Sequence, residues 1–486
     1  MNPELTSGAL ALLPVAVAVV CILVRVSPMI SAGLGFLTAA VVALLWFPEP
    51  AGVWAGRFLA QVPLFLEIML IMLGGLALAR VQEASGYMRT FSAWLLRSVP
   101  GPTAGAALVV WAIVPFAESV TGYGVGITIG IPILVHLGFG PLRAAFLGVL
   151  GLTMAPWGSL GPGTRIAAEL GRVDLTELGI ENAWINGAAV LVSVVVVTAT
   201  LRFHRPEHTV PIVLWNLLGG VTMWAGILVA NILVSTPVAG VLGSVLVLAV
   251  LFAVFRLQGN DVSMSPRVLL ALTPYLTLLL GCVAAAFVAP HVPAAAATVL
   301  TSPALWLAVG TVTSLFVSER AWAGQEPAPW NLPATAVAVV RSWAPAATAT
   351  LGFLLLGFVL TATDMAASIG DLITLTGPAG FLWIGGFLSV LGGVVTASGT
   401  GTNAMFASTF GLGADALGMD RTLVLATTNE VGAIGSNASV GRAMLASQVA
   451  GTDAAARGTL LRYLFLWVLA VYVAVLALVQ LVLAFV

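Results

Sequence analysis

Apolar runs of about 20 residues recur along this chain, and each is long enough to cross a bilayer as a helix. Of the 486 residues, 60% are hydrophobic and 8% are charged, whereas soluble domains carry roughly 25% charged residues. Windows such as GSVLVLAVLFAVF (243–255) lack the alternation of a β-barrel strand. The sequence therefore predicts an all-α polytopic membrane protein with about 12 spanning helices, inverted repeats and re-entrant or broken helices, with 103–140 as a re-entrant hairpin.

Continuous spans are separated by three apolar stretches that Gly, Pro, Ser, Thr and Asn interrupt, at 103–165, 381–411 and 421–450. The polar connectors are short, so no inserted soluble domain is expected. We divide the chain into N-terminal scaffold helices (1–58), a first repeat with broken segments (59–202), middle scaffold helices (203–343) and a second repeat with broken segments (344–486).

The repeat rests on four features that occur in the same order in both halves. LGGLALARVQEASGYM (73–88) resembles LGFVLTATDMAASIGDL (356–372), and a Gly-Pro turn follows each. Two broken segments then follow in each half: AESVTGYG and APWGSLGPGTR in the first, TASGTGTN and TTNEVGAIGSN in the second. Basic residues near span ends stay cytoplasmic, which places Arg80 inside and Thr363 outside. This predicts inverted topology, with chance similarity between apolar sequences as the alternative.

The four breaks predict a substrate site. Unwound backbone at membrane depth persists only where it lines a polar cavity or is buried in protein, and paired breaks in inverted halves mark the binding site of a transporter. A helix that restarts after a break presents free N–H groups that suit an anion. Close helix packing through small residues is the alternative. The candidate substrate-binding residues are Ser119, Thr121, Gly122, Tyr123, Gly124, Ser159, Gly161, Arg165, Ser398, Thr400, Gly401, Thr402, Asn403, Asn429, Ser436 and Asn437.

Two acids, Glu118 and Glu430, lie deepest in the broken segments. A carboxylate at the bilayer centre is costly, so it should face the interior, pair, or bind a proton. We predict that Glu118, with Glu430 as a second candidate, couples transport to protons; the alternative for Glu118 is a cap on the following half-helix. Glu67 is expected in a helix–helix contact. Arg165 is expected either at a substrate carboxylate or as an interface anchor.

The chain lacks an HExxH motif, a paired Cys motif and a Walker loop, so no metal, cofactor or enzyme activity is expected. The expected partners are a small anion, protons and the lipid bilayer, and not nucleic acid.

The broken segments resemble those of the lactate permease family, proton-linked carriers of lactate and glycolate. The resemblance rests on AESVTGYGVGITIGIPILVHLGFGPLRAA (117–145), APWGSLGPG (155–163), TASGTGTNAMF (396–406) and TNEVGAIGSNASVGR (428–442). Residues that carry over from the family pattern are Glu118, Gly122, Gly124, Gly158, Asn403 and Gly435. The resemblance implies inverted repeats, a transport domain that moves against a scaffold, and a homodimer as a common assembly.

This chain departs from the family pattern in the fourth segment. Ser436 stands where the pattern has Lys, Val440-Gly441 stands where it has Pro-Gln, and Glu430 replaces a Thr, while a basic residue occurs instead at Arg442. We therefore predict a proton-coupled transporter of a small monocarboxylate in a bacterial inner membrane. The alternatives are a carrier of another organic anion, such as a sulfonate, phosphonate or antibiotic, an anion channel, and a membrane-embedded enzyme.

Overall fold

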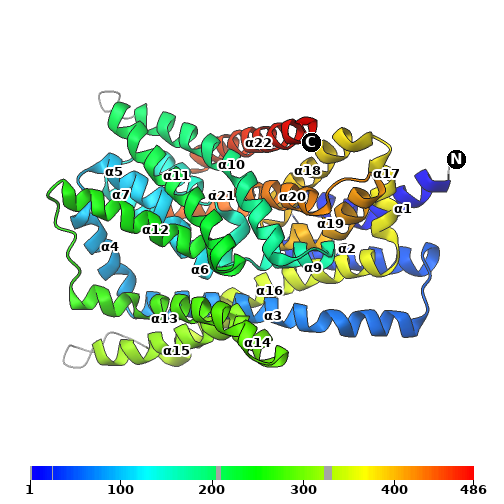
Figure 1. Ribbon diagram of the computed structural model, residues 1–486, viewed down its shortest axis with the longest axis horizontal. Coiled ribbons are helices and arrows are strands. Elements are labelled where there is room, and N and C mark those ends of the chain that lie inside the picture. The colour runs from blue at the N-terminus through cyan, green and yellow to red at the C-terminus, as the bar shows by residue number, and fades with distance from the viewer. Residues whose placement is uncertain (1–2, 25, 204–208, 322–330, 486) are drawn as a thin grey trace.

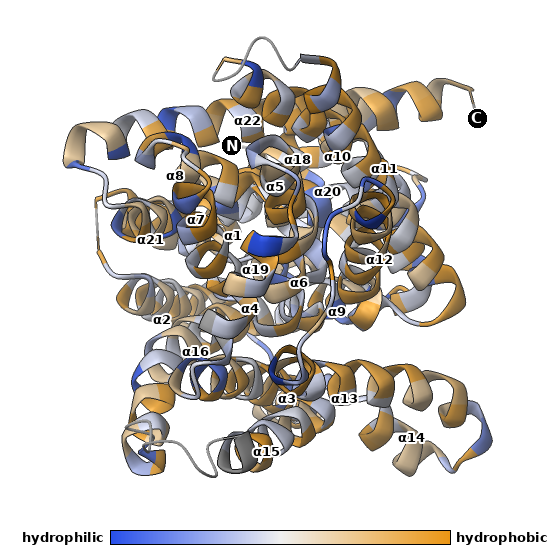
Figure 2. Ribbon diagram, turned by 90° about the vertical axis from the view of Figure 1, so that its left-hand side faces the viewer, coloured by the Kyte–Doolittle hydropathy of each residue, from blue (hydrophilic) through white to orange (hydrophobic). Residues whose placement is uncertain are grey.

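The computed structural model describes residues 3–24, 26–203, 209–321 and 331–485, and these residues form helices and no strand. Eleven of the described helices are long and apolar enough to cross a membrane, or up to 12 if the bent pair Ala294–Thr301 and Pro303–Ser318 is one span. Large apolar side chains such as Leu44, Leu280 and Phe316 are exposed, and Figure 2 shows α13 mostly in the hydrophobic colour. The predicted polytopic all-α fold is confirmed.

The chain begins with two helices, α1 (Pro3–Leu23) and α2 (Pro28–Trp46). The first half continues through α3 (Ala51–Ala84), α4 (Tyr87–Ser98), α5 (Pro102–Leu108), η1 (Val109–Ile113), α6 (Val114–Thr121), α7 (Val125–His136), α8 (Pro141–Leu150), η2 (Ala155–Leu160), α9 (Pro162–Gly171) and α10 (Leu175–Arg202). The π-helical turn η1 lies just before Pro115, which has no N–H to donate, so the wider turn accommodates the proline within the helix.

Five helices and one short turn connect the halves: α11 (Thr209–Leu233), α12 (Thr236–Leu257), α13 (Pro266–Val288), η4 (Ala289–His291), α14 (Ala294–Thr301) and α15 (Pro303–Ala321). The second half comprises α16 (Leu332–Ala362), α17 (Met365–Thr374), α18 (Gly377–Thr396), α19 (Gly399–Ala416), α20 (Arg421–Gly435), η5 (Ser436–Ala438), α21 (Val440–Ala450) and α22 (Ala454–Phe485).

The two halves share one order of elements. Both α3–α10 and α16–α22 begin with a long helix, a short helix and a span that ends in a break. Each half then continues with two helices, a 3₁₀ turn, a short helix and a long last helix. Left-handed residues recur at matching ends: Gly138 and Gly418 follow α7 and α19, and Arg172 and Gly451 end α9 and α21. This order supports the internal repeat, while the inversion of the second half stays a prediction.

The helices lie in two layers. In Figure 1, α3, α13, α14, α15 and α16 run along the lower edge, and α10, α11, α12, α20 and α22 lie above them. α3 packs against α15 and α16, whereas α19 and α20 pack with α9, α10 and α18. We call these the long-helix layer (α3 and α13–α16) and the broken-helix layer (α5–α12 and α18–α22). α2 packs along α16.

The predicted domain boundaries relate to this layering in two ways. α3 and α16 run without interruption through the boundaries set at 58/59 and 343/344. α11 and α12, placed by the sequence among the middle scaffold helices, pack on α10 and α6 in the broken-helix layer. The helices therefore group into the two layers, and these layers do not coincide with the four successive segments predicted from the sequence.

Candidate functional site

A cavity of about 560 Å³ lies where the broken segments meet the long-helix layer. Its walls come from the break between α6 and α7, from η2 and the start of α9, from the break between α18 and α19, and from α20 and α21. The long-helix layer contributes Pro345, Ala346, Ala349, Thr350 and Phe353 of α16, and Ser27–Met29 at the start of α2 also lines the cavity. The volume is within the range of small-molecule sites, roughly 300–1,000 Å³.

The first-half breaks each contain three consecutive residues in the left-handed region. Gly122, Tyr123 and Gly124 have φ of 70°, 57° and 80°. Ser159, Leu160 and Gly161 have φ of 55°, 62° and 73°. A tyrosine, a serine and a leucine are strained in this conformation, and such strain gathers at functional sites. At Gly122 a side chain is also excluded by space, because an added Cβ would lie 2.7 Å from Ser159 Cβ.

Glu118 fills the N-terminus of α7. Its carboxylate accepts hydrogen bonds from the N–H groups of Gly124, at 3.2 and 3.1 Å, and of Gly126, at 3.3 Å. The residue is 3% exposed, yet it lines the cavity. The capping role that the sequence left open for Glu118 is therefore present. A negative charge at this place is stabilised by the free N–H groups and by the positive end of the helix dipole.

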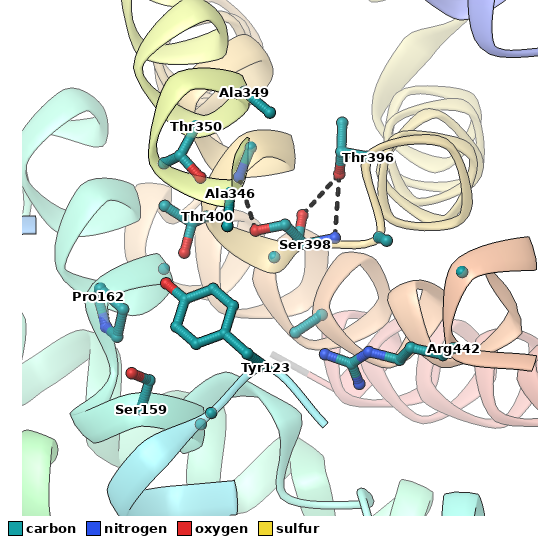
Figure 3. A pocket seen from close by; sticks show the side chains of 18 of the residues that line it. Tyr123, Ser159, Pro162, Ala346, Ala349, Thr350, Thr396, Ser398, Thr400 and Arg442 are labelled. Atoms are coloured by element: carbon teal, nitrogen blue, oxygen red, sulfur yellow. Dashed lines mark hydrogen bonds between the residues drawn. The ribbon is translucent and has the colours of Figure 1, made fainter. Parts of the chain in front are cut away.

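Arg442 in α21 brings a positive charge to the same cavity. Its Nη2 lies 3.8 Å from Glu118 Oε1, and its Nη1 donates to Asn437 Oδ1. The side chain is 17% exposed, so it is largely desolvated but can still be reached from the cavity. Figure 3 shows the guanidinium and the Tyr123 ring projecting into one space, with Thr400, Ser398 and Thr350 around it.

The break before α19 is built differently. Thr396 Oγ1 accepts from Ser398 N–H and donates to Ser398 O, and Ser398 Oγ accepts from Gly401 N–H at 3.3 Å (Figure 3). Ser398, Gly399, Thr400 and Gly401 all line the cavity. The first turn of α19 thus faces the cavity with N–H groups that a helix cannot bond internally, and no carboxylate of the described residues caps it.

Glu430 lies behind the cavity wall. It is fully buried and accepts from Asn182 Nδ2 at 2.5 Å and from Asn186 Nδ2 at 2.8 Å, both on α10. Among the described residues it has no ion-pair partner. Asn429, its neighbour in sequence, lines the cavity and donates to Asn182 Oδ1 at 2.6 Å. One amide therefore separates Glu430 from the cavity-lining Asn429.

Comparison with known proteins identifies the family. The family model described as "L-lactate permease" matches residues 7–267, which is more than half of the chain. This chain belongs to the L-lactate permease family. A Haemophilus influenzae protein named "Putative L-lactate permease" is 30% identical over 126 residues, an alignment that covers 25% of this chain and 24% of that protein. The alignment thus spans about a quarter of that relative.

The family match covers the first-half motifs that suggested the lactate permease resemblance, while the second-half motifs lie beyond residue 267. At the departure in the fourth segment, Ser436 is buried and its Oγ donates to Ala433 O, so it brings no charge to the cavity. The positive charge in the cavity wall of this lactate permease family member comes from Arg442.

The structure brings eight of the 18 predicted site residues to the cavity surface. Those that line it are Glu118, Gly122, Tyr123, Ser159, Ser398, Thr400, Gly401 and Asn429. Gly124 donates its N–H to Glu118, Asn403 donates to Asn429 Oδ1, and Asn437 accepts from Arg442, so these three support the wall.

Other predicted residues are not in the cavity wall. Ser119 lies 3.8 Å from Met154 Sδ, and Thr121 Oγ1 donates to Ala117 O of its own helix. Thr402 Oγ1 donates to Ser398 O, and Gly161 is the left-handed residue before α9. These residues, like Ser436 and Glu430, lie behind the cavity wall, in or next to the broken segments.

Arg165 lies in a second cavity, of about 230 Å³, and not in the first. Its Nη2 forms an ion pair with Glu67 Oε2 at 2.9 Å, which joins α9 of the broken-helix layer to α3 of the long-helix layer. The helix–helix contact predicted for Glu67 is thus present, and its partner is Arg165.

The α16 wall of the cavity was not predicted from the sequence, and Arg442, Asn182 and Asn186 were not among the predicted site residues. α16 reads as an ordinary apolar span, and only Pro345 within it marks an irregularity. Asn182 and Asn186 are buried amides one helical turn apart on α10. An apolar helix with two amides at that spacing was the available signal, because such residues in membrane helices seek polar partners.

Proposed function

We propose that this protein is a secondary transporter of a small hydroxy-monocarboxylate, such as lactate or glycolate, that moves with protons across a bacterial inner membrane. The family membership and the apolar helices support transport. The observation that carries the substrate class is Arg442 in the cavity wall, opposite the open N-terminus of α19. A guanidinium fork and free helix N–H groups are both suited to a carboxylate.

The contacts suggest how the substrate binds. Arg442 Nη2 lies 3.8 Å from Glu118 Oε1, a long separation, so a substrate carboxylate entering the cavity can pair with this nitrogen while Nη1 keeps its hydrogen bond to Asn437. The hydroxyl groups of Ser398 and Thr400 lie at the α19 end of the same cavity. They offer donors and acceptors to a substrate hydroxyl, which favours a hydroxy acid over a plain carboxylate.

The proton is assigned from the different surroundings of the two acids. Glu118 holds two backbone N–H groups and lies beside Arg442, so its charge is well stabilised. Glu430 is fully buried with only two neutral amide donors, which makes its charge costly to retain. The sequence favoured Glu118 as the proton carrier; we propose that Glu430 takes the proton and that Glu118 holds α7 and Arg442 in place.

The location of the cavity supports alternating access. The site lies between the broken-helix layer and α16 of the long-helix layer, so a shift of one layer against the other would open it to either side of the membrane. Among the described residues, Glu67–Arg165 is the ion pair that joins these layers. A homodimer is the assembly we expect, following the family resemblance.

The test is uptake by proteoliposomes of the purified protein. We expect an imposed inward proton gradient to drive accumulation of lactate or glycolate, and propionate, which lacks the hydroxyl, to compete weakly. Saturable accumulation of a sulfonate or phosphonate without lactate uptake would show that the substrate is that anion and not a hydroxy-monocarboxylate. Flux that does not saturate would indicate a channel, and chemical conversion of the substrate in detergent would indicate an enzyme.

A further inference from the structure

Glu430 is held by two amides of α10 that play different parts. Asn182 and Asn186 are four residues apart, so both point from one face of α10 toward α20. Asn182 donates to Glu430 Oε2 and Asn186 donates to Oε1. Each carboxylate oxygen therefore has its own amide donor, and the two amides can be considered separately.

Asn182 belongs to a chain whose donor direction is fixed. Asn429 Nδ2 donates to Asn182 Oδ1 at 2.6 Å and to Thr164 Oγ1 at 3.1 Å. Asn403 Nδ2 donates to Asn429 Oδ1 at 2.7 Å and to Gly163 O at 3.0 Å. Thr164 donates to Pro156 O at 2.7 Å.

The carbonyls of Gly163 and Pro156 can only accept hydrogen bonds. Turning Asn182 over would therefore place its NH₂ against the NH₂ of Asn429 and would force the whole chain to reverse. Asn182 is for this reason a fixed link from Glu430 to Asn429 in the cavity wall.

Asn186 is free of that constraint. Its Nδ2 donates to Glu430 Oε1 and to Thr153 O at 3.0 Å, whereas its Oδ1 is buried and has no hydrogen-bond partner within the described residues. A buried polar atom without a partner costs about 1–3 kcal/mol and is rare in native proteins. The carboxylate beside it has two acceptor oxygens when ionised and gains an O–H donor when protonated.

We propose that Asn186 is the partner that responds to the proton on Glu430, while Asn182 keeps the acid connected to the substrate cavity. When a proton binds Glu430 Oε1, the Asn186 amide turns and its Oδ1 accepts the new O–H. Its Nδ2 then leaves Thr153 O, a carbonyl two residues before η2 begins. Loss of the proton reverses the turn. Proton binding is in this way transmitted to the second break, which lines the cavity. This rests on the proposed function, in which Glu430 binds the coupled proton.

Within the described part of the chain, no other charged group competes for Glu430. α20 packs against α9, α10, α18, α19, α22, η2 and η5, and α18, η2 and η5 carry no charged residue. Arg421 pairs with Asp415, Arg165 pairs with Glu67, and Glu181 lies near Asp420. Tyr472 donates to Trp383 O and Tyr463 packs on Phe146. The remaining charged residues on these helices are exposed or half-buried, and none of them pairs with Glu430: Glu169, Glu177, Arg202, Arg457 and Arg462.

The experiment compares Asn186→Leu with Asn182→Leu in proteoliposomes. Two readouts are measured: lactate counterflow without a gradient, across a pH series, and accumulation driven by a pH gradient. Asn186→Leu should keep the KM for counterflow within about twofold, change its pH profile and lose accumulation. Asn182→Leu should raise the KM about tenfold, because Asn429 loses its acceptor, and keep gradient-driven accumulation; tenfold corresponds to about 1.4 kcal/mol. Its pH profile should shift but persist, because Glu430 loses one donor and keeps Asn186 as the responding partner.

The matched control is Asn231→Leu. Asn231 is also buried with an unpartnered Oδ1, but its Nδ2 donates only within its own helix, to Ile227 O, so both readouts should stay as in the wild type. If Asn186→Leu fails to fold, Asn186→Ser serves instead; its short hydroxyl should partly restore the pH response.

A wild-type pH profile in a folded Asn186 variant, or identical phenotypes at 182 and 186, overturns the inference. If Glu430→Gln leaves the pH profile and accumulation unchanged, the proposed proton site itself fails. The two failures are therefore distinguishable.

Discussion

The break before α7 and the break before α19 occupy equivalent places in the two halves, yet the helix N-termini that follow them are filled differently. The α7 N-terminus is closed by Glu118, which accepts from Gly124 and Gly126. The α19 N-terminus is capped, among the described residues, by the Ser398 hydroxyl and opens into the cavity. One half therefore supplies a fixed anion at its helix end, and under the proposed function the other half receives the substrate anion.

Backbone strain follows the same division. The first-half breaks contain Tyr123, Ser159 and Leu160 in the left-handed region, whereas the break before α19 contains Ala397 alone and the one before α21 contains none. The strained half is braced by Glu118 and by packing, such as the close approach of Gly122 to Ser159. Arg442, from the second half, then lies between the fixed carboxylate and the open helix end.

The largest effect is expected from Arg442. Arg442→Ala removes the cation that should pair with the substrate, and a hydrogen bond to a charged group contributes about 1.5–3 kcal/mol, so we expect the KM for lactate counterflow to rise about 10- to 100-fold. Arg442→Lys should recover part of the loss, because a lysine keeps the charge but not the planar fork. Counterflow by both variants with an unchanged KM would show that the open α19 end alone binds the anion.

A smaller and opposite effect is expected from Glu118→Gln. The amide keeps an oxygen for the Gly124 N–H but leaves Arg442 without its buried counter-charge. A substrate anion then replaces that charge, so the KM should fall about tenfold, maximal velocity should fall because release is slower, and lactate should raise the melting temperature more than in the wild type. Loss of proton-driven accumulation with normal counterflow would instead show that Glu118 is the proton carrier, as the sequence analysis predicted.

The sequence predicted the breaks far better than the contacts across them. The break at Gly122-Tyr123-Gly124 could be predicted because glycine interrupts an apolar run there, and α7 begins at the next residue, Val125. The hydrogen-bond and ion-pair partners of Glu430 and Arg165 could not be predicted from the sequence. Asn182, Asn186 and Glu67 are distant from them in the chain, and only the packing of the helices brings them close. Which face of α20 turns toward α10, and away from the cavity, likewise depends on the whole bundle.

A modest effect is expected when the open helix end is altered. Ser398→Ala removes the cap on Gly401 N–H, and N-cap loss costs about 1 kcal/mol, so the KM for lactate should rise about fivefold. Ser265→Ala is the matched control: Ser265 caps α13 through Val268 N–H and does not line the cavity. It should lower stability to a similar extent and leave the KM unchanged. Equal KM effects at both positions would mean that Ser398 acts only through stability.

The smallest effect is expected at Ala397, the left-handed residue in the break before α19, with φ of 56°. Glycine adopts this conformation without the steric penalty of about 1–2 kcal/mol that alanine meets. The greater freedom of glycine in the unfolded chain lowers the free energy of unfolding by up to about 1 kcal/mol, which offsets part of that gain. Ala397→Gly should therefore raise the melting temperature in detergent slightly and leave the KM for lactate within twofold. A clear fall in melting temperature would show that the second-half break depends on the alanine side chain, and that the two halves differ less in strain than their backbone angles indicate.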